Sequence, residues 1–152
     1  MAAAKVALIM GSSSDMEKVE PAEEILKRMG VEVKTAVLSA HRMPEKLREF
    51  VLMAPSEGVE VFIAAAGKAA HLPGVVASMT TLPVIGIPIS SPDLGGLDAL
   101  LSMVQMPRGV PVATVAIDGA ANAALLACTI LALKYEEVAQ ALKAYRDELA
   151  AG

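Results

Sequence analysis

The chain has 152 residues, a hydrophobic fraction of 55% and a net charge of −4 at neutral pH. This length is typical of one domain with a sizeable core, so we expect residues 1–152 to form a single domain. The basic residues are scattered, and only two Tyr and two Phe are available to stack on bases. The composition therefore excludes a nucleic-acid-binding protein.

No apolar run approaches the ~20 residues that a bilayer span requires, and the N-terminal segment has no basic leader before a long apolar stretch. The one cysteine, Cys128, cannot form an intrachain disulfide, and its apolar helical surroundings suit a buried thiol. We therefore expect no membrane contact and a cytoplasmic location. The surplus of apolar residues then indicates contacts between the subunits of a homo-oligomer.

The first apolar run, KVALIM at 5–10, predicts a buried strand because it is short and stopped by the turn residues GSSSD. From Val19 onward the apolar residues fall at helical spacing, and Gly30 stands where a C-terminal cap belongs. Pro21 would remove a backbone donor deeper in a helix, so we place it in the first turn.

The strand, loop and helix pattern then repeats along the chain. Further strands are expected at 31–38, 59–66, 82–88 and 110–117, and helices between them at 45–55, with Pro44 first, and at about 72–80. The segment 94–109 precedes the fifth strand. Strands that alternate with helices at this spacing specify right-handed crossovers and a parallel sheet covered on both faces. The sequence predicts an α/β fold, a three-layer αβα sandwich with a flavodoxin-like sheet.

Two helical stretches close the chain. Residues 119–133 are apolar nearly all round, so we expect them to be buried within the domain or between subunits. The last helix, at about 134–150, carries one apolar stripe that includes Val138, Leu142 and Tyr145. It packs either on its own subunit or on a neighbouring one.

The chemistry gathers in the loops after the first four strands, because ligands of open parallel sheets bind outside the carboxyl ends of the strands. These loops hold serines, both histidines, an arginine and a lysine, a set that fits a phosphorylated small molecule. In GSSSD the serines and Asp15 suit either a well-capped turn or a ligand site. In the second case Ser12 and Ser14 donate to phosphate, and Asp15 accepts from sugar hydroxyls.

The loop SAHRMP places His41 beside Arg42 at the end of the second strand. Arginine can bind phosphate with two hydrogen bonds, and histidine can carry a proton in either direction near neutral pH. His71 has two open interpretations: with Lys68 it binds a carboxylate, or it begins a helix and bonds to backbone. No cluster has metal-ligand spacing, so no metal is expected, and Ser-His-Asp catalysis lacks its nucleophile elbow.

The motifs MGSSSD, SAHRMPEKL, GKAAHLPGVVAS, PVIGIP, LGGLDALLSMVQMPRGVPVATVAI and AANAALLA occur in this order. Together they closely resemble the N5-carboxyaminoimidazole ribonucleotide mutase family of purine biosynthesis. The resemblance implies a cofactor-free octamer that moves a carboxylate from the exocyclic nitrogen of the aminoimidazole ribonucleotide to ring carbon C4, which is an isomerase reaction. It implies that His41 is the catalytic histidine of this catalytic domain.

The resemblance also implies the ligand-binding positions. Ser12 and Asp15 fall at positions that bind the phosphoribosyl part, and Arg42 at one that binds the phosphate, with Ser14 and Ser39 beside them. Gly67 and His71 are expected to shape a pocket for CO2.

Three departures from the family pattern are visible: Ala65 and Lys68 replace glycines, and the turn IDGAAN at Asp118-Gly119 is short. A related branch of the family carboxylates aminoimidazole ribonucleotide directly with CO2 and has a basic residue at the Lys68 position, so a direct carboxylase is the nearest alternative. Lys68 itself is expected to point outward. A non-catalytic nucleotide- or flavin-binding module is the alternative of another class, although no loop offers an aromatic pair to hold a flavin.

Overall fold

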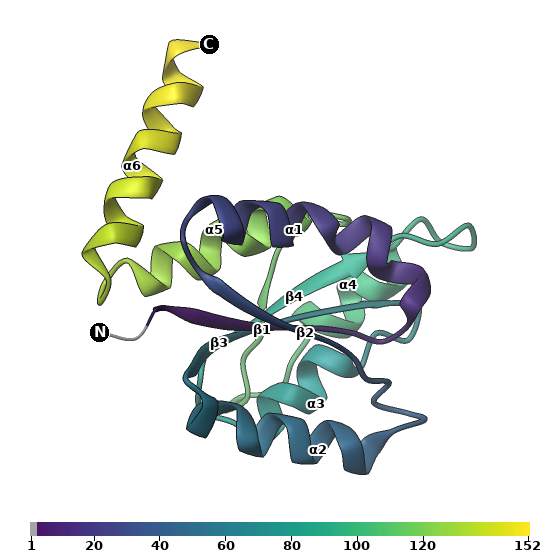
Figure 1. Ribbon diagram of the computed structural model, residues 1–152. Coiled ribbons are helices and arrows are strands. Elements are labelled where there is room, and N and C mark those ends of the chain that lie inside the picture. The colour runs from purple at the N-terminus through teal and green to yellow at the C-terminus, as the bar shows by residue number, and fades with distance from the viewer. Residues whose placement is uncertain (1–2) are drawn as a thin grey trace.

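A five-stranded sheet with all strands parallel organises the chain (Figure 1). The computed structural model describes residues 3–152. The strand order is β2-β1-β3-β4-β5, which is the flavodoxin-like order, so the predicted fold class is confirmed. The strands are β1 (Lys5–Met10), β2 (Glu32–Val37), β3 (Val59–Gly67), β4 (Val84–Ile89) and β5 (Ala113–Thr114).

Helices cover both faces of the sheet and so complete the three layers (Figure 1). On one face lie α1 and α5, and on the other lie α2, α3 and α4. The helices are α1 (Met16–Arg28), α2 (Pro44–Met53), α3 (Leu72–Ser78), α4 (Leu97–Val104), α5 (Ala120–Leu131) and α6 (Glu136–Ala151). None of the helices among residues 3–152 is long and apolar enough to cross a membrane.

The two cores explain why the central strands read as continuous apolar runs. Leu8 of β1 and Ile63 of β3 face α1 and α5, whereas Ile9 and Phe62, their neighbours along the strands, face α2, α3 and α4. All four side chains are fully buried. Because alternate side chains of a strand point to opposite faces, a sheet covered on both sides needs an apolar residue at every position.

Two expectations about the elements are wrong. Pro21 lies at the sixth residue of α1 and not in its first turn, because the helix begins at Met16, directly after a 3-10 turn. Pro21 is exposed, so the missing donor lies on the solvent side of the helix. The predicted fifth strand shrinks to Ala113–Thr114, and beyond it only single bonds, such as Val115 N to Gly86 O at 3.1 Å, continue along β4.

The end of α1 follows the prediction. Gly30 has a φ of +76°, a left-handed conformation that glycine adopts without steric penalty. The amide of Gly30 bonds to the carbonyl of Lys27, and the amide of Val31 bonds to that of Leu26. The chain therefore leaves the helix through a glycine cap of the Schellman kind.

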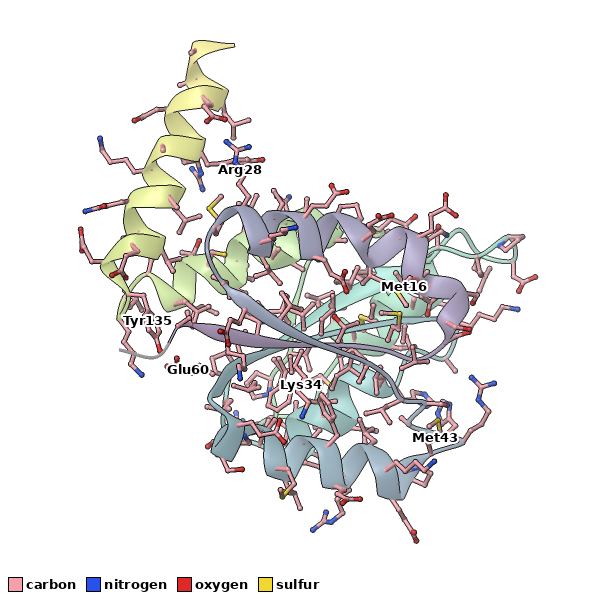
Figure 2. The ribbon with its side chains drawn as sticks, viewed as in Figure 1. Met16, Arg28, Lys34, Met43, Glu60 and Tyr135 are labelled. Carbon is pink, nitrogen blue, oxygen red and sulfur yellow. The ribbon has the colours of Figure 1, made fainter. Side chains whose placement is uncertain are left out.

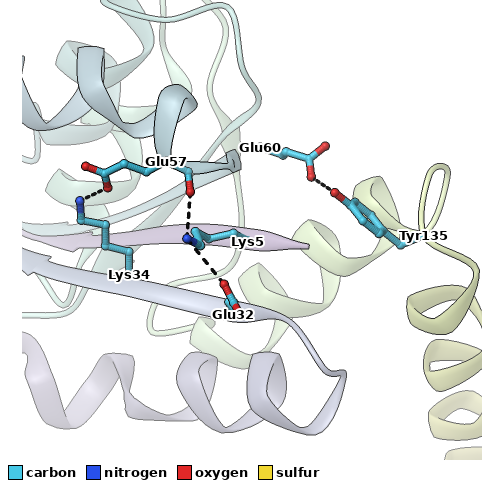
Figure 3. Close-up of polar contacts among 6 residues, drawn as sticks. All are labelled: Lys5, Glu32, Lys34, Glu57, Glu60 and Tyr135. Atoms are coloured by element: carbon cyan, nitrogen blue, oxygen red, sulfur yellow. Dashed lines mark hydrogen bonds and ion pairs between the residues drawn. The ribbon is translucent and has the colours of Figure 1, made fainter. Parts of the chain in front are cut away.

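The final helix, α6, projects away from the sandwich (Figure 1) and contacts its own chain along one side: it packs on α5, and Glu148 near its tip pairs with Arg28 of α1. Val138 is buried near the base, whereas Leu149 near the tip is 61% exposed. Tyr135 donates to Glu60 at the start of β3 (Figures 2 and 3), and this bond lowers the pKa of the Glu60 carboxyl although partial burial acts against it. The base of α6 is thus fixed to its own subunit.

Charged side chains join the amino ends of the strands (Figure 3). Lys5 of β1 donates to the backbone carbonyl of Glu57 at 2.8 Å and lies 3.6 Å from the carboxylate of Glu32. Lys34, on the edge strand β2, pairs with the carboxylate of Glu57. This end of the sheet is therefore tied together by charge pairs, and the residues that face a ligand must be sought at the other end.

Candidate active site

A small cleft of about 160 Å³ opens at the carboxyl ends of β1, β2 and β3. It spans the gap between β1 and β3, where the strand order reverses direction, which is the usual ligand position in such sheets. All but one of the expected site residues line it: Ser12, Asp15, Ser39, His41, Arg42, Gly67 and His71. The exception is Ser14, which is exposed and lies outside the lining of the cleft.

The loop after β1 both caps a turn and faces the cleft. The Ser12 hydroxyl accepts from the Ser14 amide at 3.3 Å and lies 2.9 Å from the Ser14 hydroxyl. Ser12 therefore caps the 3-10 turn Ser13–Asp15, as the capping interpretation expects, whereas Asp15 at the N-cap of α1 makes no capping bond with its side chain. The Ser14 hydroxyl bonds to Ser12 outside the cleft. Burial raises the pKa of the Asp15 carboxyl, and the nearby charge of Lys18 acts in the opposite direction.

Arg42 joins the loops after β1 and β2. Its backbone N–H and its Nε both donate to the Ser39 hydroxyl, at 3.2 and 3.3 Å, and its Nη2 donates to the Gly11 carbonyl at 3.2 Å. Ser39 is buried, so this hydroxyl fixes the guanidinium from inside the protein. An arginine has five N–H donors, so others remain to bind an anion in the cleft.

The two histidines of the chain meet at the cleft. Nε2 of His41 lies 2.7 Å from Nδ1 of His71, and the rings are nearly perpendicular at 86°. His71 stands at the N-cap position of α3 but makes no capping bond with its side chain. One nitrogen of this contact must donate and the other accept, so a single proton lies between the rings.

Lys68 adopts a left-handed conformation with a φ of +54°, in the loop after β3. Its ammonium lies 2.8 Å from the Asp93 carboxylate, and both side chains are about two-thirds exposed, at 66% and 64%. As expected, the lysine points outward in this chain. Gly67 beside it packs closely on β4, since a Cβ there would lie 3.3 Å from the Ile89 carbonyl oxygen, a tight contact.

The loop after β4 does not contribute to the cleft, contrary to expectation. Ser90 bonds instead to Asp118: its amide donates to Oδ1 at 2.9 Å, and its hydroxyl donates to Oδ2. Lys18 donates to the hydroxyl and the carbonyl of Ser90, at 2.8 and 3.0 Å. The sequence carried a partial signal for this cluster, namely the short turn at Asp118, but nothing that linked the turn to Lys18.

A metal site is not evident in the part of the chain that the structure describes, since residues 3–152 hold no group of three or more potential ligands. The cleft holds acid–base groups and hydrogen-bond donors: a histidine pair, a guanidinium and serine hydroxyls. These groups can hold an anion at one end and exchange a proton at the other.

The fold and the cleft define a class: a flavodoxin-like α/β enzyme with a histidine pair at the carboxyl edge of its sheet. The family model described as AIR carboxylase matches residues 5–151, and the chain belongs to this family.

Curated relatives cover nearly the whole chain. It is 57% identical over 145 residues to the N5-carboxyaminoimidazole ribonucleotide mutase of Saccharolobus solfataricus, with 95% of this chain and 92% of that protein covered. It is 55% identical to the mutase of Pyrococcus abyssi, covering 95% of this chain and 83% of that one. The phosphoribosylaminoimidazole carboxylase of Schizosaccharomyces pombe is 49% identical, but the match covers only 26% of that protein.

A solved structure agrees with the fold. PurE of Treponema denticola superposes with a TM-score of 0.89 at 32% sequence identity, with 97% of this chain and 92% of that chain covered. The agreement spans the sheet and the covering helices.

Proposed function

We infer that the chain is an N5-carboxyaminoimidazole ribonucleotide mutase, a single catalytic domain over residues 1–152 that acts without a cofactor. The observation that carries this inference is the contact of His41 with His71 in the cleft that also holds Arg42. Mutases of this name are 57% and 55% identical to the chain, which supports the choice of reaction.

The reaction needs one proton and a confined CO2. His41 donates a proton to the exocyclic nitrogen of the carbamate, the bond from that nitrogen to the carboxyl carbon breaks, and CO2 forms. The C4 carbon of the ring then attacks the CO2. In the resulting intermediate, C4 carries both the new carboxylate and its original hydrogen. His41 removes that proton and restores the aromatic ring. Proton and electrons balance, and no external acid or base is consumed.

His71 is proposed to align His41 through the contact of 2.7 Å. Because only one proton fits between the two nitrogens, a change on one ring changes what the other can donate or accept. Gly67, Ala69 and His71 line the cleft next to this pair and are proposed to hold CO2 close to C4, so that the second step keeps the advantage of proximity.

The phosphoribosyl part occupies the other end of the cleft. Arg42, held by Ser39 and by the Gly11 carbonyl, is proposed to bind the phosphate together with the Ser12 hydroxyl. Asp15 accepts from the sugar hydroxyls. Ser14 supports this loop through its bond to Ser12 and does not touch the ligand.

Two alternatives remain to be tested against this proposal. The direct carboxylase would use Lys68 to attract bicarbonate or CO2, yet Lys68 is paired with Asp93 outside the cleft lining. The flavin-binding module would need aromatic rings at the site, yet Phe62 is fully buried in the core and Phe50 packs against the same core.

The test supplies the N-carboxylated ribonucleotide to the wild type and to His41→Asn with labelled bicarbonate in the buffer. We expect wild-type product without label from the buffer, and a rate roughly 10²–10⁴-fold lower for the folded variant because general acid–base catalysis is lost. Label in every turnover would favour the direct carboxylase. Near-normal turnover by His41→Asn would remove the histidine from the mechanism.

We also propose a homo-octamer in the cytoplasm, with the ribonucleotide as the small-molecule partner. From the sequence we expect the subunit contacts to be built largely from residues 120–133 and the last helix; α5 buries six of its twelve residues within its own chain, and Leu133 just after it is 91% exposed. Large apolar side chains are also exposed on α4 and just before it: Leu94, Leu97, Leu101 and Val104. We define these four as the α4 stripe and place a subunit contact there, together with the projecting α6.

A further inference from the structure

The short turn at Asp118 has a structural consequence outside the cleft. Asp118 adopts a left-handed conformation with a φ of +58°, and its amide bonds to the carbonyl of Pro88 at 2.8 Å. This places its carboxylate at the end of β4, where it accepts from the amide and the hydroxyl of Ser90. The turn therefore presents a charged group to the carboxyl edge of the sheet.

Lys18 of α1 completes this cluster. Its ammonium donates to the carbonyl and the hydroxyl of Ser90, and it lies 4.0 Å from Oδ1 of Asp118. We call Lys18, Ser90 and Asp118 the edge bracket. It joins three elements that are distant in sequence: the start of α1, the end of β4 and the turn before α5.

The edge bracket fixes the direction of a lysine that would otherwise move freely. Lys18 is 43% exposed, and an unrestrained side chain of this length has many rotamers. Three contacts hold its ammonium against Ser90 and Asp118. Lys18 follows Asp15, the N-cap of α1, by three positions, so the two side chains are neighbours on the helix surface, and Asp15 is half-buried and lines the cleft. An opposite charge at this range favours the ionised form of a carboxyl group.

We propose that the edge bracket makes Lys18 a positioning residue for Asp15: it fixes a positive charge on the residue one helical turn after the carboxylate that accepts the sugar hydroxyls of the substrate. The inference rests on the proposed function, because it needs Asp15 to bind the sugar. Lys18 itself does not line the cleft and acts only through Asp15.

The pH dependence follows from the sign of this interaction. Burial raises the pKa of Asp15 and Lys18 lowers it, so removal of the lysine charge allows Asp15 to take up a proton at a higher pH. Protonated Asp15 accepts sugar hydroxyls more weakly. The loops after β2 and β3 also present His41, Arg42 and His71 to the cleft, so the effect must be measured as a difference between variants.

The experiment compares Lys18→Met, Lys18→Arg and Asp118→Asn with the wild type, and Lys27→Met on the same helix is the matched control. Binding of ribose 5-phosphate is followed by calorimetry across the acid pH range, and KM, kcat and the unfolding temperature are measured beside it. We expect Lys18→Met to bind about two- to fivefold more weakly near pH 5, with little change in kcat. Its acid limb should move to higher pH, and Lys18→Arg should restore the wild-type profile.

Asp118→Asn should not move the acid limb to higher pH, because it removes a negative charge that offsets Lys18 while Lys18 keeps its two bonds to Ser90. If Lys18→Met lowers only the unfolding temperature and leaves the acid limb unchanged, the edge bracket is structural and the inference is wrong. If wild type neither binds ribose 5-phosphate nor converts the ribonucleotide, the proposed function fails instead. The two failures are thus distinguishable.

Discussion

At the scale of single residues, Arg42 has two proposed roles, joining two loops and binding the phosphate. One substitution can distinguish these roles from the proton transfer by His41. Arg42 ties the Gly11 loop to the Ser39 loop and also faces the cleft. A charge-assisted hydrogen bond contributes roughly 1.5–3 kcal/mol, which corresponds to about one to two orders of magnitude in affinity.

Arg42→Ala is therefore expected to weaken ribonucleotide binding about 10- to 100-fold, measured by calorimetry, with a much smaller effect on kcat. Arg48→Ala on α2 is the control, since it removes an exposed arginine of the same neighbourhood. If an analogue without the phosphate lost the same affinity, the phosphate would not be the partner of Arg42.

Lys68 provides a second test at this scale, because its conformation and its contact have opposite effects on stability. A non-glycine residue in the left-handed region costs about 1–2 kcal/mol, and an exposed ion pair contributes about 0–1 kcal/mol. Lys68→Gly should therefore be as stable as the wild type or slightly more so, and Lys68→Ala about 1 kcal/mol less stable than Lys68→Gly in urea unfolding. Both variants should keep the preference for the N-carboxylated ribonucleotide, and a changed preference would place Lys68 in the chemistry.

Much of the site could be predicted from the sequence, since the carboxyl ends of parallel strands converge and their loops bring Ser12, His41 and His71 together. The contact between the two histidines could not, because it depends on side-chain rotamers at the ends of two loops. The contacts of Lys18 with Ser90 and Asp118 could not be predicted for a similar reason: Asp118 reaches β4 only through a left-handed turn.

At the scale of elements, apolar runs and glycine caps located the strands and helices well where both faces of the sheet are covered. β1 and the Gly30 cap follow the prediction, because burial on both sides leaves the sequence few options there. The length of the fifth strand was overestimated. Residues 110–117 are apolar, but they are exposed or half-buried at the edge of the sheet, and only two of them pair with β4. An apolar edge of this kind reads like a core strand in a single sequence.

The start of α4 allows a matched test of why two glycines stand in succession. Gly95 and Gly96 both have positive φ, at +64° and +95°, but a Cβ would meet open space only at Gly95. At Gly96 it would lie 2.6 Å from Cγ2 of Ile117 and 3.1 Å from the Cα of Ser90.

Gly95→Ala should therefore destabilise the fold by about 1–2 kcal/mol through backbone strain alone. Gly96→Ala should add about 1–3 kcal/mol for the steric overlap. Chemical denaturation measures both values. Equal losses would mean that Ile117 and the loop after β4 relax without penalty.

At the scale of the whole molecule, the α4 stripe is the feature that an isolated chain leaves unexplained. Leu97, Leu101 and Val104 recur at helical spacing and are 51%, 47% and 50% exposed, while Ala99 and Met103 on the opposite side are buried. A contiguous exposed apolar patch on a soluble protein often marks an interaction site. Leu101 lies in the middle of the stripe.

Leu101→Glu is expected to reduce the molecular mass measured by light scattering, because an unpaired charge in an apolar contact is costly to bury. Circular dichroism should show that the smaller species is folded. Leu52→Glu on α2, where Leu52 is 53% exposed, is the control and should leave the mass unchanged. An unchanged mass for Leu101→Glu at micromolar concentration would place the subunit contacts elsewhere.

The edge strand β2 also bears on how the protein avoids aggregation. A bare strand edge offers unpaired backbone groups to any other extended chain, and charged side chains on the edge discourage such pairing. In EVKTAV, the sequence of β2, Glu32 and Lys34 are held by Lys5 and Glu57, so their charges stay at the edge. Glu32 of β2 pairs with Lys5 of β1. A chain in which β1 separates from β2 would therefore lose this ion pair at the edge together with the backbone hydrogen bonds between the two strands. We therefore expect aggregation of a partly unfolded chain to begin at β2, and the pair of Lys5 with Glu32 serves both to tie β1 to this edge and to keep the edge charged.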